Sequence, residues 1–159
     1  MDKLRIMCID DQREVLNTLR KDLNKFSDHC FFIECETADE AEEVLEEIDK
    51  CGEYLALVIC DQVMPGKNGV DFFIDLNQDG RFGHVKKLLL TGLATHEDTI
   101  KAINQAHIDH YIEKPWSLKN FQHTVSILLT EYICDSGLDY EDYIKIIDQN
   151  TLYRKLREG

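Results

Sequence analysis

The chain has 159 residues, which is the length of one domain with room for a short appendage. Its 31 acidic residues outnumber 18 Lys and Arg, and the net charge of −13 argues against a surface that binds nucleic acid or anionic lipid. No apolar run approaches the ~18–20 residues of a membrane-spanning helix, and no signal peptide is visible. The six cysteines lack zinc-site spacing. We expect a cytoplasmic protein with reduced, mostly buried thiols, no membrane association and no direct nucleic-acid contact.

The chain alternates short apolar runs with apolar residues at helical spacing, and one of its helices begins with the capping box Thr37-Ala-Asp-Glu40. In chain order, the pattern predicts a strand at 4–9, a helix over 15–26, a strand at 31–35, a helix over 37–48, a strand at 55–60, a helix over 70–76, a strand at 85–90, a helix over 97–106, a strand at 110–112 and a helix over 117–132. Five strand–helix units in a row indicate an α/β fold with a doubly wound, five-stranded parallel sheet and helices on both faces.

We divide the chain into a domain at 1–134 and a helical extension or linker at 135–159. Asp135-Ser-Gly137 is typical of a helix end. From Asp139 to Arg157 the pattern predicts one further helix with Tyr140, Ile144 and Ile147 on one face. An apolar face of this kind is expected to pack on a partner or a second copy, so a homodimer is possible, although packing on the chain's own domain is equally open.

Polar residues follow several predicted strands at their carboxyl ends, where open parallel sheets bind ligands. They are Asp10 and Asp11, Asp61, Thr91 and Lys114. Converging carboxylates repel one another unless a cation neutralises them, and oxygen ligands favour Mg²⁺. A hydroxyl and an ammonium beside such a cation would suit a phosphoryl group during transfer. Taken singly, the aspartates could cap a helix, Thr91 could end a strand in a turn, and Lys114 could be an ordinary surface lysine. Their occurrence together, each at the end of a strand, favours a phosphoryl-binding site.

The motifs Asp10-Asp11, Asp61-Gln-Val-Met-Pro-Gly, Leu-Leu-Leu-Thr91-Gly and Tyr111-Ile-Glu-Lys114-Pro resemble the receiver domain of two-component response regulators. The resemblance covers about residues 3–134, and it implies that the doubly wound sheet is of the flavodoxin-like, receiver type, with the predicted C-terminal helix as an addition. It implies a regulatory domain that accepts a phosphoryl group from a sensor histidine kinase and then controls an output domain or protein, which the sequence does not identify. Such a domain is not an enzyme beyond its own phosphorylation and dephosphorylation.

The resemblance also implies a role for each matching residue. Asp61 would be the phosphoacceptor. Asp11 would bind Mg²⁺ directly, Asp10 largely through water, and the carbonyl of Val63 would be a further ligand beside Asp61.

Three more positions match residues that respond to the phosphoryl group. Thr91 and Lys114 would contact its oxygens. Tyr111 would turn inward when Thr91 contacts the phosphoryl group. The face formed by the helix near 97–106, the strand at Tyr111 and the helix from Ser117 would then change. Apolar side chains at Val63 and Leu93 would slow hydrolysis by keeping water from the phosphoryl group.

Three other classes remain to be weighed. A Mg²⁺-dependent phosphohydrolase with an aspartate nucleophile is the main alternative, but its Asp-x-Asp pattern is missing after the first strand, where Asp11-Gln12 follows Asp10. A flavodoxin-like flavin carrier would need a phosphate-binding loop where these acids stand. A degenerate receiver used only for binding would lack an Asp or the Lys, and none is lacking.

Overall fold

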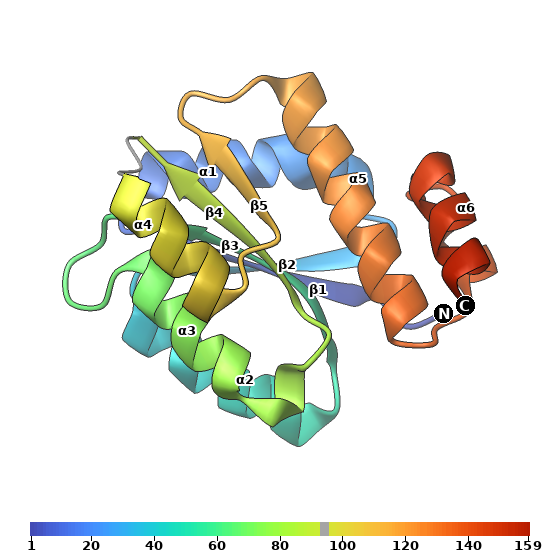
Figure 1. The fold of residues 1–159 in the computed structure, drawn as a ribbon, viewed down its shortest axis with the longest axis horizontal. Coiled ribbons are helices and arrows are strands. Elements are labelled where there is room, and N and C mark those ends of the chain that lie inside the picture. The colour runs from blue at the N-terminus through green and yellow to red at the C-terminus, as the bar shows by residue number, and fades with distance from the viewer. Residues whose placement is uncertain (93–95) are drawn as a thin grey trace.

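The computed structural model describes residues 1–92 and 96–159, except for the side chains of residues 96, 98 and 99. Its centre is a five-stranded parallel sheet with the order β2-β1-β3-β4-β5 (Figure 1). The strands are β1 (Leu4–Ile9), β2 (Cys30–Cys35), β3 (Tyr54–Asp61), β4 (Lys86–Thr91) and β5 (His110–Glu113). The predicted fold class is therefore confirmed, and every predicted strand lies within one residue of its observed bounds at each end.

Helices cover both faces of this sheet. They are α1 (Arg13–Leu23), α2 (Ala38–Cys51), α3 (Gly69–Gln78), α4 (His96–Lys101), α5 (Leu118–Asp135) and α6 (Gln149–Glu158), with 3₁₀ turns η1 (Asn24–Phe26), η2 (Gly80–Phe82) and η4 (Tyr140–Tyr143) and a π-helical segment η3 (Ala102–Ala106). The Thr37 hydroxyl accepts the Glu40 amide N–H at 3.0 Å, as the capping box predicts, and Gly52 directly after α2 adopts the left-handed conformation.

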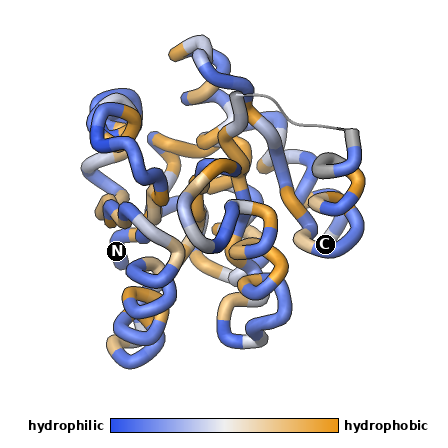
Figure 2. Tube along the Cα trace, turned by 90° about the vertical axis from the view of Figure 1, so that its left-hand side faces the viewer, coloured by the Kyte–Doolittle hydropathy of each residue, from blue (hydrophilic) through white to orange (hydrophobic). Residues whose placement is uncertain are grey.

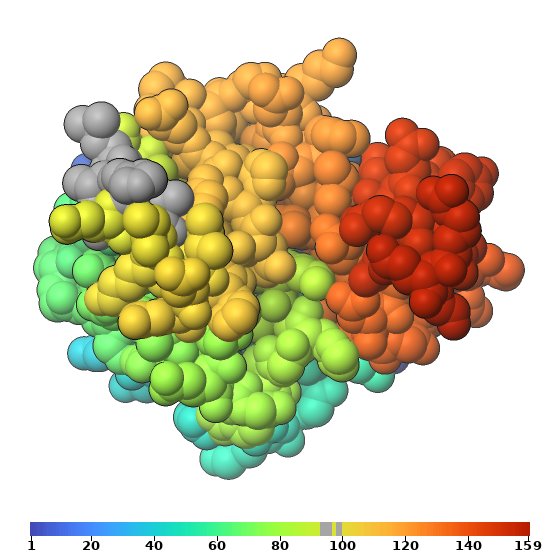
Figure 3. All heavy atoms as spheres, viewed as in Figure 1, coloured from blue at the N-terminus to red at the C-terminus, as the bar shows by residue number. Residues whose placement is uncertain are grey.

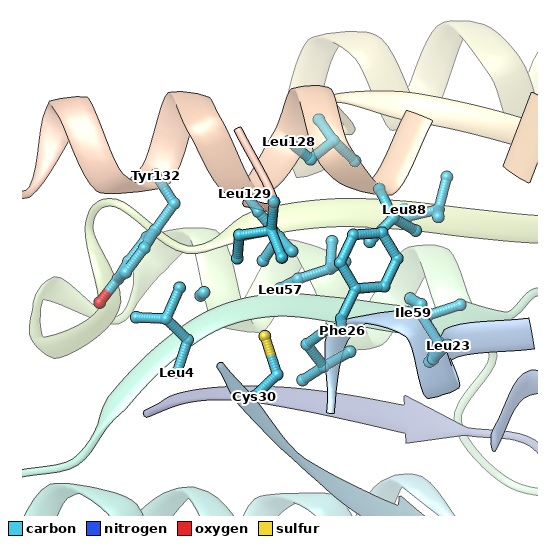
Figure 4. Packing of buried hydrophobic residues seen from close by; sticks show 14 of the residues in the cluster. Leu4, Leu23, Phe26, Cys30, Leu57, Ile59, Leu88, Leu128, Leu129 and Tyr132 are labelled. Atoms are coloured by element: carbon cyan, nitrogen blue, oxygen red, sulfur yellow. The ribbon is translucent and has the colours of Figure 1, made fainter. Parts of the chain in front are cut away.

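Two apolar cores lie on opposite faces of the sheet. One fills the space between the sheet and helices α1 and α5, where side chains such as Phe26, Leu57 and Leu129 meet (Figure 4). The other lies under α2 and α3, and Ala102 and Ala106 of η3 complete it. Coloured by hydropathy, the chain is mostly apolar along the central strands and mostly polar along the outer helices (Figure 2). Between these two cores, the strands of the sheet are fixed on both faces.

The predicted helix over 97–106 is only partly correct. The α-helix ends at Lys101, and residues 102–106 wind as a π-helix before His107, whose φ of 50° is left-handed. The residues that face α3 here are the small Ala102 and Ala106, both fully buried. Local periodicity does not distinguish an α turn from a π turn, which explains the difference.

The predicted single helix from Asp139 to Arg157 is wrong. The segment forms the 3₁₀ turn η4, a loop and then α6, because Asp139 and Asp148 each cap the segment that follows. Its apolar residues also divide differently from the predicted stripe. Tyr143, Ile146, Ile147 and Leu152 are buried in the core beside α5, whereas Ile144 is 48% exposed.

The extension packs against α5 of its own chain (Figures 1 and 3). The Ser126 hydroxyl donates to the Ile146 carbonyl at 2.6 Å, and the Thr130 hydroxyl accepts the Asp148 amide at 2.9 Å. Asp135 at the end of α5 pairs with Lys155 of α6 at 2.6 Å. In the part of the chain that the structure describes, no helix is long and apolar enough to cross a lipid bilayer.

Candidate functional site

The sheet order brings the predicted site residues together at the carboxyl ends of the strands. β1 and β3 are neighbours, so Asp10 and Asp11, which follow β1, meet Asp61 at the end of β3. Asp61 lies opposite Leu90 on β4, which puts Thr91 next in the adjacent strand. One ligand oxygen from each of the three aspartates lies within 4.8 Å of the others. Among the described residues this is the only group of His, Cys, Asp and Glu that could hold a metal ion.

The three carboxylates differ in their access to solvent. Asp10 is fully buried and accepts the Gln12 amide N–H at 2.8 Å, while Asp11 is exposed. Asp61 is 6% exposed. A cation entering from solvent would therefore meet the Asp11 carboxylate first and find two buried carboxylates behind it.

Lys114 reaches into this cluster from the end of β5. Its Nζ lies 2.7 Å from Asp61 Oδ1 and 3.1 Å from Asp10 Oδ2. Burial works to lower the pKa of the Lys114 ammonium, but its hydrogen bonds to Asp61 and Asp10 outweigh burial and raise the pKa. Lys114 is therefore charged at neutral pH.

The pKa of Asp61 is raised. Burial is the largest cause and the nearby Asp10 carboxylate adds to it, while the hydrogen bond from Lys114 opposes both. The ionised Asp61 is thus held where its charge is only partly compensated, and it would gain from a second cation.

Thr91 ends β4 with its side chain turned into the protein. It is 5% exposed, and its buried Oγ1 has no hydrogen-bond partner among the described residues. A buried hydroxyl without a partner is unfavourable unless a ligand supplies one, so Thr91 can offer a hydrogen bond to a ligand at the strand ends.

Two further predicted residues differ in their surroundings. Tyr111, in β5, is half-buried against the core under α3 and η3, and burial raises the pKa of its phenol. The Val63 side chain, after Asp61, is 77% exposed. Leu93, which we predict to border the same site, lies outside the described residues.

Sequence reasoning missed two polar residues beside the site. The buried Gln62 amide oxygen accepts the Val70 amide N–H at 2.9 Å, and Trp116 Nε1 donates to Asp22 Oδ2 at 2.8 Å. Gln62 stands directly after Asp61, and a polar residue in a buried motif is a signal that could have been noticed. The Trp116 contact joins the loop after β5 to α1, and nothing local in the sequence predicts it.

The profile of the response regulator receiver domain family matches residues 6–126. The chain belongs to this family. Residues 6–126 contain all the strands except the first two residues of β1, and they contain the whole strand-end cluster.

Several known proteins are similar to this receiver. The hydrogenase transcriptional regulatory protein HoxA of Cupriavidus necator is 29% identical over 111 residues, which cover 70% of this chain and 21% of that protein. The chain thus spans about a fifth of the length of the HoxA relatives. Chemotaxis protein CheY-3 of Vibrio cholerae is 29% identical over 117 residues, with 72% of this chain and 82% of that protein covered.

Solved structures show the same fold. A signal receiver domain of an HD domain-containing protein from Pseudomonas fluorescens superposes with a TM-score of 0.75 at 21% identity, covering 86% of this chain and 94% of that chain. A receiver domain protein from Methanospirillum hungatei gives a TM-score of 0.69 at 24% identity, covering 83% and 97%. At these identities the likeness concerns the fold alone.

Proposed function

We propose that this receiver accepts a phosphoryl group on Asp61 from the phosphohistidine of a sensor histidine kinase, with Mg²⁺ bound beside it. The observation that carries the proposal is the convergence of three aspartates, Lys114 and the Thr91 hydroxyl, which has no hydrogen-bond partner among the described residues, at one end of the sheet. The family match supports a regulatory signalling module over an enzyme.

The cluster's charge supports the metal. Three carboxylates face a single ammonium, which leaves two formal negative charges and fits one divalent cation. All-oxygen donors suit Mg²⁺, which binds few carboxylates and keeps several waters. In this proposal Asp11, Asp61 and the Val63 carbonyl hold the ion directly and Asp10 acts through water. When bound, Mg²⁺ neutralises the charge on the transferred phosphoryl oxygens.

The chain's own groups carry out the rest of the transfer. An Asp61 carboxylate oxygen attacks phosphorus, an O–P bond forms, the N–P bond to the donor imidazole breaks, and the imidazole leaves with the electron pair. The Lys114 ammonium, already 2.7 Å from Asp61, moves to a phosphoryl oxygen and offsets its charge. The Thr91 hydroxyl donates to another phosphoryl oxygen, which gives this buried group a partner.

The signal then leaves through the α4-β5-α5 surface. When Thr91 moves toward the phosphoryl group, it vacates space beside β5, and Tyr111 turns inward to fill it. The partly buried position of Tyr111 against the η3 core supports this coupling. Exposed Ile100 and Ile103 lie on α4 and η3, where a partner would meet them. We further propose a cytoplasmic protein that controls an output domain or protein; the naming of two relatives as transcriptional regulatory proteins supports an output of this kind.

Labelling with acetyl phosphate tests the proposal. In the presence of Mg²⁺ the parent should gain one phosphoryl group by intact mass, and chelation should suppress the gain. Asp61→Asn should gain none while keeping its circular dichroism spectrum. Asp11→Ala should label slowly and bind Mg²⁺ more weakly. Glu47→Gln, a change of exposed charge on α2, is the matched control. Equal labelling of Asp61→Asn and the parent would overturn the assignment.

A further inference from the structure

Gln62 occupies an unusual place next to the proposed site. It follows Asp61 directly, it is 7% exposed, and three hydrogen bonds join it to β4 and to the start of α3. Its amide N–H donates to the Leu90 carbonyl of β4 at 2.9 Å. Its own carbonyl accepts the Gly69 amide at 3.0 Å, and its side-chain oxygen accepts the Val70 amide at 2.9 Å.

These bonds complete the N-terminus of α3. The N–H groups in the first turn of a helix have no acceptor within the helix. In α3 they are those of Gly69, Val70 and Asp71, since the Phe72 N–H makes the first helical hydrogen bond. The Asn68 side chain accepts the Asp71 N–H, and Gln62 accepts those of Gly69 and Val70. Because the Val70 N–H is a donor, the amide oxygen of Gln62 faces it, and an apolar side chain at this position would offer no acceptor for this contact.

The same contacts close the β3–α3 loop, residues 63–68, at its base. The loop leaves the sheet after Gln62 and returns at Gly69, where a Cβ atom would lie 2.4 Å from the Asp61 carbonyl oxygen. Met64 is buried in the core under α3, and Lys67 pairs with Glu42 and Asp75 farther along the loop. Val63, the proposed carbonyl ligand, therefore lies between Gln62, which is hydrogen-bonded to β4 and α3, and the buried Met64.

We propose that Gln62 is a positioning residue for the metal site: its side chain fixes the spacing between Asp61 and the start of α3, and so holds the Val63 segment where its carbonyl is needed. This inference rests on the proposed Mg²⁺ site. Residues that orient metal ligands without touching the metal commonly change metal affinity by about 10–100-fold. Gln62 reaches the ligand set only through the backbone, so the low end of that range is expected.

The first test compares Mg²⁺ affinities. Gln62→Met has nearly the same shape but no acceptor, and it should weaken Mg²⁺ binding about tenfold. Lys67→Ala is the control in the same loop; it removes two partly exposed ion pairs, with Glu42 and Asp75, and should change affinity by less than about twofold. The single tryptophan, Trp116, two residues after Lys114, gives the fluorescence signal for the titration. Asp11→Ala serves as the reference for loss of a proposed direct ligand.

The second test does not depend on the metal. In the metal-free parent, hydrogen exchange resolved to single amides should show Val70 protected. Gln62→Met should lose that protection, and Gln62→Glu, which keeps an acceptor oxygen, should retain it. An unprotected Val70 amide in the parent would overturn the positioning role of Gln62, even if Gln62→Met failed to fold.

The outcomes separate the two claims. If the parent and Asp11→Ala show no Mg²⁺-dependent change, the proposed function fails at its metal site. If the parent binds Mg²⁺ and Gln62→Met binds it equally well, the metal site stands and the positioning role of Gln62 is rejected. Weakened binding in Gln62→Met together with loss of Val70 protection supports the positioning role.

Discussion

At the scale of single residues, Lys114 already acts as the counter-ion of the site. Its ammonium contacts the two buried carboxylates, Asp10 and Asp61, whereas the Asp11 carboxylate is exposed to solvent. The negative charge of the buried carboxylates is therefore partly compensated by Lys114, while the Asp11 carboxylate is accessible from solvent. This arrangement favours the entry of a cation without requiring Lys114 to leave, since the cation meets Asp11 first.

Removing the charge of Asp61 should stabilise the metal-free fold. Burial raises the pKa of Asp61 above its usual 3.8, so the folded protein holds this proton more tightly than the unfolded chain does. Stability from this group is present at low pH and is lost as the pH rises from about 3.8 through the folded pKa. Asp61→Asn should thus melt at a higher temperature than the parent at pH 7, and the difference should shrink toward pH 3.8.

Thermal melts across this pH range with a chelator present check the expectation. Glu47→Gln, exposed on α2, controls for the general effect of removing one negative charge. A lower melting temperature for Asp61→Asn at pH 7 would mean that its ion pair with Lys114 outweighs burial.

The Val63 side chain gives a second expectation at the scale of single residues. Val63 is 77% exposed and offers no hydrogen bond, so it cannot orient a water for hydrolysis of an aspartyl phosphate. Val63→Asn should shorten the lifetime of the phosphorylated protein, measured as loss of label after the donor is removed. An unchanged or longer lifetime would show that this side chain does not govern hydrolysis.

At the scale of elements, the extension behaves as part of the fold. Ser126 and Thr130 lie one helical turn apart on α5 and bond to the backbone of the tail, while Asp135 joins α6 to β4 through Lys155 and Lys86. The prediction of one continuous helix over residues 139–157 does not include these contacts. The caps at Asp139 and Asp148 were the local signals that could have divided that segment.

Two isoleucines of this segment form a matched pair for testing its packing. Ile146 is 4% exposed and Ile144 is 48% exposed. Ile146→Ala should lower stability by about 2–5 kcal/mol, as buried large-to-small changes do. Ile144→Ala should stay within about 0.5 kcal/mol of the parent. Urea unfolding followed by circular dichroism measures both, and equal effects would show that the tail is not docked in solution.

At the scale of the whole molecule, the sheet, the layers and the strand-end cluster follow from the sequence because β1, β3, β4 and β5 each carry a polar residue at or directly after their carboxyl end. Parallel topology then brings Asp10, Asp61, Thr91 and Lys114 to one edge without further information. The π turn, the bond from Val70 to Gln62 and the choice between the two open packings of the tail depend on contacts between elements. Local periodicity contains no information on such contacts, so it could not decide these features.

The six thiols differ in burial, because four of them lie inside the two apolar cores. Cys51 is exposed and Cys134 is half-buried, whereas four thiols are buried, and burial raises the pKa of Cys30 and Cys35 to about 12. Because the thiolate is the reactive form, an aromatic disulfide reagent at neutral pH should modify Cys51 quickly, Cys134 slowly and the rest only on unfolding. Stability should also fall as the pH rises from 9 toward 12, since the unfolded chain releases these protons first. Rapid modification of more than two thiols in the native protein would contradict the described packing.

The central claim is that Asp61 itself receives the phosphoryl group. After labelling with acetyl phosphate and Mg²⁺, borohydride reduction converts an aspartyl phosphate to homoserine, and peptide mass spectrometry locates the altered residue. We predict homoserine at position 61, with unaltered aspartate at positions 10 and 11. Label at Asp10, at Asp11 or at a residue outside the strand-end cluster, with Asp61 unaltered, would contradict the account.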